Sequence, residues 1–277
     1  MINRYTIFGS PVAHSLSPAI HHMFGRLTQR RVHYTRTEAS KDNFKDKVVN
    51  WRNEGGKGCN VTAPFKELAF SLCDRLHEGA ALAGAVNTIE IHRDGSMVGH
   101  NTDGIGLLED LQSNKRLTLT AKRILMLGAG GAARGALAPL LSAQPSELII
   151  ANRTPGRASQ LAELFSEYGN TSALGYNELE AAGNFDLIIN ATSMGFDNEA
   201  PPIPTSIFSA KSFAYDMMYS RTSTPFLTWC ANNGVKHLSD GFGMLVEQAA
   251  DAFLVWEGVR PKTRKVYLAS TEIMDSV

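Results

Sequence analysis

The stretch RILMLGAGGAARGAL, residues 123–137, decides the fold of this chain of 277 residues. Its first five residues form a strongly apolar run that predicts a buried strand. Gly128, Gly130 and Gly131 follow at once, with Ala129 and Ala132 among them, and an alanine- and leucine-rich helix is predicted to about residue 141. Glycines allow a tight turn and close approach of a pyrophosphate, and the helix N-terminus offers free N–H groups to its phosphates. The stretch therefore predicts a dinucleotide-binding turn.

The spacing of these glycines departs from the strict GxGxxG pattern. Ala133 stands at the third glycine position, where small side chains are accepted. An ordinary glycine turn of an α/β domain stays open as the alternative.

The next strand indicates which dinucleotide binds. In ELIIANRTPGR (147–157) the strand ends in Asn152, Arg153 and Thr154, and Arg157 follows. NAD-binding folds usually place an acidic residue here for the ribose 2′-hydroxyl, whereas arginines suit a 2′-phosphate. The residues favour NADP over NAD, with a solvated helix start as the alternative for the two arginines.

Strands alternate with helices along the rest of the chain, which predicts an α/β protein with mostly parallel sheets. A Rossmann-like, NADP-binding domain is expected at 104–242, and a separate α/β domain at 1–103. Helices within 243–277 are expected to pack back on that first domain. In the first domain we expect strands at 4–8, 32–37 and 58–61 and a helix over 65–76.

Composition excludes several classes of function. Lysine plus arginine equals aspartate plus glutamate at 27 each, so no global field attracts nucleic acid or an acidic membrane. No apolar run approaches a spanning helix or a signal peptide. Three unpaired cysteines and scattered histidines favour reduced thiols in the cytoplasm and no metal site.

Polar residues of the first domain carry the chemistry. Lys66 falls in the first turn of a predicted helix, where it faces an unfavourable dipole. Asp103 can act in chemistry or cap the helix that follows it. Ser15 and Ser17 can bind a carboxylate or serve as N-caps. With threonine and amide neighbours such as Asn87, these groups suit a polyhydroxylated acid.

The chain resembles the shikimate dehydrogenase family over nearly its whole length. The segments that carry the resemblance are FGSPVAHSLSP (8–18), GCNVTAPFK (58–66), AGAVNT (83–88), NTDG (101–104), GAGGAAR (128–134), NRT (152–154), INATSMG (189–195), YDMMY (215–219) and DGFGMLVEQAA (240–250). The resemblance implies NADP-dependent, reversible reduction of 3-dehydroshikimate to shikimate, a step toward aromatic amino acids.

The resemblance also implies a role for each matching residue. Lys66 and Asp103 would be the catalytic pair. Substrate would be held at its carboxylate by Ser15 and Ser17 with help from Tyr219, and elsewhere by Asn60, Thr62, Asn87 and Gln248. The NADP set would be Glu78, Gly128, Ala129, Gly130, Gly131, Ala132, Asn152, Arg153, Thr154 and Arg157, with Ala191, Thr192, Met217 and Gly241 on the nicotinamide side. Met217 can instead be a packing residue.

Three other functions compete with this interpretation. A quinate/shikimate dehydrogenase would accept quinate and often NAD. A folate-type methylene dehydrogenase shares the two-domain plan but lacks the NTDG and NVTxPFK segments. A non-catalytic NADP-binding regulator would be expected to lose Lys66 or Asp103. A monomer or homodimer acting on a small molecule is expected.

Overall fold

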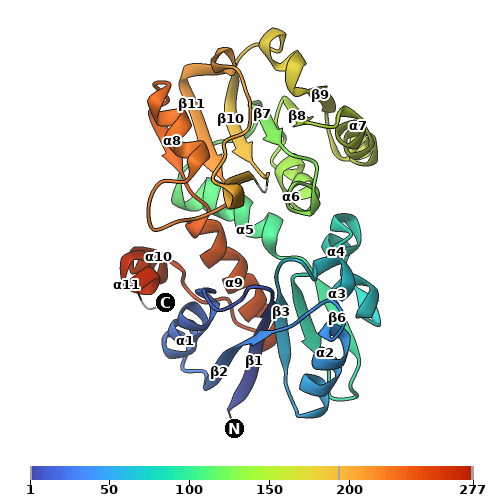
Figure 1. The fold of residues 1–277 in the computed structure, drawn as a ribbon. Helices are drawn as coiled ribbons and strands as arrows, with labels where there is room; N and C mark the ends of the chain where they lie inside the picture. Colours follow the sequence, from blue (N-terminus) through green and yellow to red (C-terminus); the bar gives the residue numbers. More distant parts are fainter. Residues whose placement is uncertain (1, 193, 276–277) are drawn as a thin grey trace. The chain divides into compact units, whose positions relative to one another are not determined.

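A computed structural model describes residues 2–192 and 194–275 of the chain (Figure 1). The chain forms two compact units. The first runs to Gly106 and resumes at Leu245, and the second spans Leu107–Met244. Two helices, α5 (Asp103–Glu109) and α9 (Phe242–Glu257), contain the points where the chain passes from one unit to the other.

The first unit is built on a mixed sheet of six strands in the order β2-β1-β3-β5-β6-β4. Strands β1, β2 and β3 are parallel, whereas β5 runs antiparallel to both β3 and β6. The elements are β1 (Asn3–Gly9), α1 (Ser17–Thr28), β2 (Val32–Glu38), α2 (Phe44–Asn53), β3 (Gly58–Val61), α3 (Lys66–Leu72), β4 (Arg75–Leu76), α4 (Glu78–Ala83), β5 (Thr88–Ile91), β6 (Met97–His100), α10 (Arg264–Leu268) and α11 (Ser270–Asp275).

Apolar side chains cover both faces of this sheet. One cluster gathers Phe8, Val61 and Ile89 with residues of α2 and α3. On the other face the ring of Tyr5 stacks on Trp256 of α9, with 4.5 Å between ring centroids. Because the central strands β1 and β3 are buried along most of their length, close packing holds their carboxyl ends as supports for polar loops.

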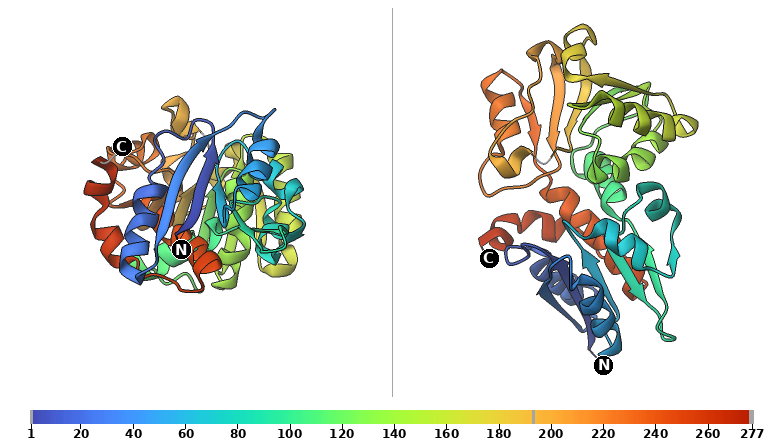
Figure 2. Two further views of the ribbon diagram at one scale, coloured as in Figure 1. Left: turned by 90° about the horizontal axis from the view of Figure 1, so that it is seen from below. Right: turned by 45° about the vertical axis from the view of Figure 1, so that its right-hand side comes forward.

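The second unit has a parallel sheet of six strands in the order β12-β11-β10-β7-β8-β9. Helix α7 packs on β8 and β9, and α8 packs on β11 and β12, as two views show (Figures 1 and 2). The elements are η1 (Asp110–Asn114), β7 (Arg123–Leu127), α6 (Gly131–Ser142), β8 (Glu147–Asn152), α7 (Pro155–Leu164), η2 (Ser166–Tyr168), β9 (Thr171–Gly175), η3 (Tyr176–Ala181), β10 (Phe185–Asn190), η4 (Met194–Asp197), η5 (Thr205–Ile207), β11 (Phe208–Asp216), α8 (Pro225–Asn232) and β12 (His237–Ser239).

Strand order identifies the ligand edge of this second sheet. The chain moves outward from β7 to β8 and β9, then returns to the other side of β7 for β10, β11 and β12. This is the strand order of a dinucleotide-binding sheet, and its switch point lies between β7 and β10. The α/β class and the Rossmann-like sheet predicted from the sequence are confirmed.

The helix predicted over 65–76 is wrong in its last four residues. Helix α3 ends at Leu72, and β4 then pairs with β6. The backbone N–H and the carboxylate of Asp74 both bond to the backbone of Met97. Tertiary pairing with a strand more than 20 residues later overrides the local helical pattern. Strand β9 was likewise not predicted.

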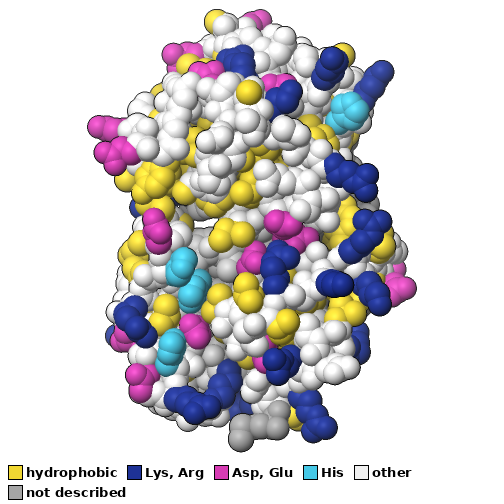
Figure 3. All heavy atoms as spheres, turned by 180° about the vertical axis from the view of Figure 1, so that it is seen from behind, with side chains coloured by type: hydrophobic (Ala, Val, Ile, Leu, Met, Phe, Trp, Pro, Cys, Tyr) yellow, Lys and Arg dark blue, Asp and Glu magenta, His cyan; other side chains and the backbone are white. Residues whose placement is uncertain are grey.

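Charged side chains of both signs are spread over the face shown in Figure 3, in keeping with a net charge of zero. Among the residues that the structure describes, none of the helices is long and apolar enough to cross a membrane. The same residues contain no group of three or more histidine, cysteine or acidic side chains placed to hold a metal ion.

Candidate active site

Lys66 and Asp103 meet in the first unit, although 37 residues separate them in sequence. Lys66 begins α3 and Asp103 begins α5. The Lys66 ammonium donates to Oδ2 of Asp103 at 2.5 Å, and the two side chains are 32% and 15% exposed. The pair is therefore screened from bulk water yet open to a ligand. The carboxylate of Asp103 is taken up by this pair rather than by a helix cap.

Asn87 holds the second oxygen of that carboxylate. Its Nδ2 donates to Oδ1 of Asp103 at 2.8 Å, and its Oδ1 accepts from the backbone N–H of Thr102 at 2.9 Å. Asn87 is almost completely buried. A buried amide with both ends engaged cannot rotate, so Asn87 fixes the plane of the Asp103 carboxylate.

Gln248 and Thr102 close the same cluster. Gln248 belongs to α9, and its Oε1 lies 3.4 Å from both Nδ2 of Asn87 and the hydroxyl of Thr102. Its own amide nitrogen donates to the carbonyl of Leu245. Close packing supports this approach, because a Cβ on Gly106 would overlap the backbone of Gln248.

The two serines lie together at the start of α1. The hydroxyl of Ser15 donates to that of Ser17 at 3.2 Å and accepts from the backbone N–H of Ser17 at 3.3 Å. The Arg36 guanidinium donates twice to the carbonyl of Ser15, at 2.9 Å from Nε and 2.6 Å from Nη2. Two hydroxyls therefore lie together at the N-terminus of α1, in a loop whose carbonyl binds the Arg36 cation.

Asn60 and Thr62 complete the predicted substrate set in the first unit. Asn60 is buried in β3, and its amide donates to the carbonyl of Asn87 and to the hydroxyl of Thr88. Thr62 follows β3, and its backbone N–H donates to the carbonyl of Phe8. Asn60 and Thr62 therefore lie at the carboxyl end of β3, where the backbone of Thr62 is bound to β1.

The sequence did not single out Tyr34, Thr88 or Thr102, although all three bond to predicted site residues. Thr88 and Thr102 adjoin predicted residues in AGAVNT and NTDG, and that adjacency was a usable signal. Tyr34 has no such neighbour, and in a sequence it is one more aromatic residue in a strand.

The glycine turn of the second unit has the geometry that a dinucleotide needs. Gly128 follows β7 with φ of +105°, and a Cβ there would press on the backbone of Ala191 at 3.2 Å. Among residues 2–192 and 194–275, no atom outside the adjoining backbone lies within 4 Å of a Cβ built on Gly130 or Gly131. The space over the start of α6 is therefore open to a pyrophosphate, and the helix offers its N–H groups there.

The end of β8 lacks a carboxylate. Asn152 turns its amide onto the carbonyl of Thr154, and Pro155 opens α7. Arg153 and Arg157 are exposed. Burial raises the pKa of the Tyr176 phenol, and the positive charge of Arg153 partly opposes this rise. The residues present fit a 2′-phosphate at this corner, because two exposed guanidinium groups lie there and residues 152–157 include no carboxylate.

Residues after β10 and β11 line the other side of the switch point. The backbone N–H and the hydroxyl of Thr192 both donate to Oδ1 of Asn190, at 3.2 and 2.8 Å. The N–H of Met217 donates to the carbonyl of Asn190, and Gly241 packs so closely on Met217 that a Cβ would overlap the Met217 carbonyl. Gly241 is thus required for backbone packing.

Two predicted residues lie in a different unit from the rest of their sets. Tyr219, predicted to help bind the substrate, belongs to the second unit, where its ring meets Phe242 edge-on. Glu78, predicted to bind the cofactor, is exposed at the start of α4 in the first unit. Their roles stay predictions.

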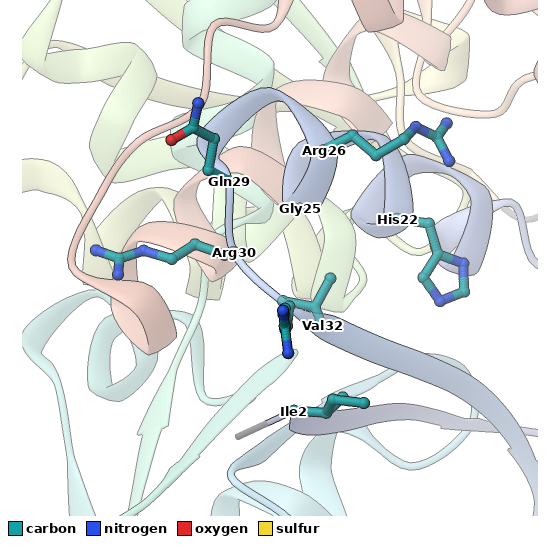
Figure 4. Close-up of a pocket in the computed structure, with 8 residues that line it drawn as sticks. Ile2, His22, Gly25, Arg26, Gln29, Arg30 and Val32 are labelled. Atoms are coloured by element: carbon teal, nitrogen blue, oxygen red, sulfur yellow. The ribbon is translucent and has the colours of Figure 1, made fainter.

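A surface pocket beside the end of α1 is not part of this site. His22, Gly25, Arg26, Arg30 and Val32 are among its lining residues. Figure 4 shows Arg26 and Arg30 pointing away from each other, so their charges do not converge on one ligand.

These two units define a class of protein. One carries a dinucleotide-binding sheet, and the other carries a lysine–aspartate pair among serines and amides. This is the construction of a nicotinamide-dependent dehydrogenase of the two-domain α/β kind.

Comparison with known proteins gives the family. Residues 7–89 match the shikimate dehydrogenase substrate binding domain, and residues 110–195 match the shikimate/quinate 5-dehydrogenase family. A shikimate dehydrogenase (NADP(+)) of Aeromonas hydrophila is 52% identical over 96% of both chains. The chain belongs to the shikimate dehydrogenase family.

Solved structures agree. An Ael1 enzyme from Pseudomonas putida is 44% identical, with a TM-score of 0.89 over 95% of this chain and 96% of that one. Shikimate 5-dehydrogenase of Thermus thermophilus, in complex with NADP(H) and shikimate, is 32% identical, with a TM-score of 0.86 over 98% of this chain and all of that one.

Proposed function

We propose that this protein catalyses the reversible, NADP-dependent reduction of 3-dehydroshikimate to shikimate. The observation that carries the proposal is the Lys66–Asp103 pair, held by Asn87 in the unit whose residues 7–89 match the family's substrate binding domain. The first unit would bind the ring acid and the second would bind NADP. A relative that is 52% identical bears the name of this NADP-dependent activity.

Each polar group has a task in that reaction. Bound NADPH would supply a hydride to the ketone carbon. As the ketone oxygen gains charge, the Lys66 ammonium donates a proton to it, and the neutral amine takes that proton back in the reverse direction. Asp103 keeps Lys66 in place and accepts from a ring hydroxyl. Acid–base help of this kind contributes roughly 10²–10⁴ in rate.

Binding of the acid would rest on the serine pair. A carboxylate accepts from the hydroxyls of Ser15 and Ser17, and the Arg36 charge behind Ser15 favours an anion there. Oδ1 of Asn60 and the hydroxyl of Thr62 would bind ring hydroxyls, with Tyr219 and Gln248 as further contacts.

NADP would lie on the turn formed by Gly128, Ala129, Gly130, Gly131 and Ala132. Its 2′-phosphate would meet Asn152, Arg153, Thr154 and Arg157, and its nicotinamide would face Thr192, Met217 and Gly241. Glu78 is retained as a proposed cofactor contact. We also propose that the enzyme works in the cytoplasm as a monomer or homodimer.

The test is spectrophotometric. Purified protein is given shikimate or quinate with NADP or NAD, and reduced nicotinamide is followed by absorbance. Reduction with shikimate and NADP, at much higher kcat/KM than the other three pairs, is the expected result. Equal use of quinate or NAD would move the protein to the broader quinate/shikimate branch.

A variant tests the role of Lys66. Lys66→Met keeps the length of the side chain and removes its proton, so kcat should fall by roughly 10²-fold or more, with a much smaller change in KM. A large rise in KM at normal kcat would show that Lys66 only binds. No turnover by the wild type, in protein that still binds NADP, would favour a regulator.

A further inference from the structure

Tyr34 lies where the serine pair meets the amides of the site. It is 2% exposed in β2, and its hydroxyl donates to Oδ1 of Asn60 at 2.7 Å. Burial raises the pKa of the Tyr34 phenol well above its usual value, the nearby thiol of Cys59 adds to the rise, and a hydrogen bond from Ser17 opposes it. The phenol therefore stays protonated and contacts residues of both predicted subsites.

Hydrogen bonds continue from Asn60 to the catalytic pair without a break. Nδ2 of Asn60 donates to the hydroxyl of Thr88 at 2.9 Å. That hydroxyl donates to Oδ1 of Asn87 at 3.0 Å, and Asn87 donates to Asp103. The complete chain is Tyr34, Asn60, Thr88, Asn87, Asp103 and Lys66.

The Asp103 carboxylate decides which group donates and which accepts in each hydrogen bond of this chain. A carboxylate paired with an ammonium only accepts, so Asn87 must turn its NH₂ to Asp103 and its oxygen to Thr88. Thr88 must then donate to Asn87 and accept from Asn60. The oxygen of Asn60 is left facing Tyr34, which must donate.

This order decides what Asn60 can offer a ligand. Both hydrogens of its amide are donated, one to the carbonyl of Asn87 and one to the hydroxyl of Thr88. Only the second lone pair of Oδ1 remains. A ring hydroxyl can therefore bind Asn60 only by donating to it, and this holds only while Tyr34 keeps the amide from turning over.

We propose that Tyr34 is a positioning residue of the substrate site: through its hydroxyl it fixes the orientation of the Asn60 amide, from which hydrogen bonds lead to the Lys66–Asp103 pair. The inference rests on the proposed function, because the ring acid is the ligand whose binding reports on it. Thr88 is the second link in the same chain.

Tyr34→Phe removes the hydroxyl and leaves the ring, which stacks on His21 at 4.4 Å between ring centroids. The strand beside it supplies a matched control. Tyr5 pairs with Tyr34 in the register of β1 and β2, is 1% exposed, and donates its own hydroxyl to Glu257, outside the chain. Tyr5→Phe therefore also removes one buried tyrosine hydroxyl from the same sheet, but at a position outside the hydrogen-bond chain.

The experiment compares kcat/KM for shikimate in the wild type, Tyr34→Phe, Tyr5→Phe, Thr88→Val and the double variant Tyr34→Phe/Thr88→Val. A buried acceptor left without its donor costs enough to lower kcat/KM about 10-fold or more in Tyr34→Phe and in Thr88→Val. Tyr5→Phe should keep the wild-type value, and KM for NADP should not change in any of them.

The double variant tests whether the chain acts as one unit. Once either link is broken, breaking the other removes little more, so the double variant should resemble the worse single variant. Losses that multiply would overturn the inference, as would a Tyr34→Phe enzyme that behaves like Tyr5→Phe. A wild type that neither binds nor oxidises shikimate would overturn the proposed function and this inference together, so the two failures are distinct.

Discussion

His21 should make the first unit sensitive to acid. Its side chain is 1% exposed, stacked on Tyr34, and neither ring nitrogen has a hydrogen-bond partner among the residues that the structure describes. Burial, with a smaller effect from His22, lowers its pKa from 6.5 to about 3, and the neighbouring Asn60 amide opposes this shift. The ring is therefore neutral in the folded protein at any ordinary pH.

The sign of the effect follows from this shift. Below pH 6.5 the unfolded chain takes up a proton that the folded protein refuses, so stability falls as the pH is lowered and continues to fall until the folded pKa is reached. One proton is worth about 1.36 kcal/mol per pH unit, so two pH units below 6.5 cost about 3 kcal/mol. His21→Phe keeps an aromatic ring and removes this dependence.

Urea unfolding measures this loss of stability as the pH is lowered. Trp51 and Trp256 lie in the first unit, and a Trp229→Phe background makes the emission report on that unit alone. Between pH 6.5 and 4.5 the wild type should lose about 3 kcal/mol more than His21→Phe. At pH 7.5 the imidazole is neutral in both states, and the difference between the two proteins should stop changing with pH. Parallel stability curves from pH 7.5 to 4.5 would refute the reasoning.

Two further predictions follow from single contacts. Arg36→Gln removes the charge that holds the Ser15 carbonyl, so KM for shikimate should rise roughly threefold to tenfold at constant kcat, and an unchanged KM would show that the loop holds itself. Gly243→Ala should cost about 1–3 kcal/mol in thermal unfolding, because its Cβ would overlap the buried Asp110 carboxylate. Gly156→Ala, which meets nothing within 4 Å in α7, is the control and should be neutral or gain up to about 1 kcal/mol. Equal melting temperatures for the two alanine variants would contradict the packing argument.

The dinucleotide-binding turn could be predicted from the sequence because its determinants are local. An apolar strand, glycines and a small-residue helix stand consecutively at 123–137, and each acts on its immediate neighbours. The absence of a carboxylate after β8 is local in the same way. The family resemblance then connected Lys66 with Asp103, which the spacing of residues alone does not do.

Contacts between distant segments could not be predicted, because strand pairing decides them. β4 interrupts the expected helix at 65–76 since Asp74 finds its partners on β6. Tyr34 reaches Asn60 only because β2 and β3 both flank β1, and in the sequence it is an ordinary strand residue. The sequence by itself determined the α/β class, the nucleotide turn and the chemical groups of the site. The tertiary structure alone decided which of those groups touch and in which direction each amide faces, since a hydrogen bond depends on atoms that only the folded sheet brings within about 3 Å.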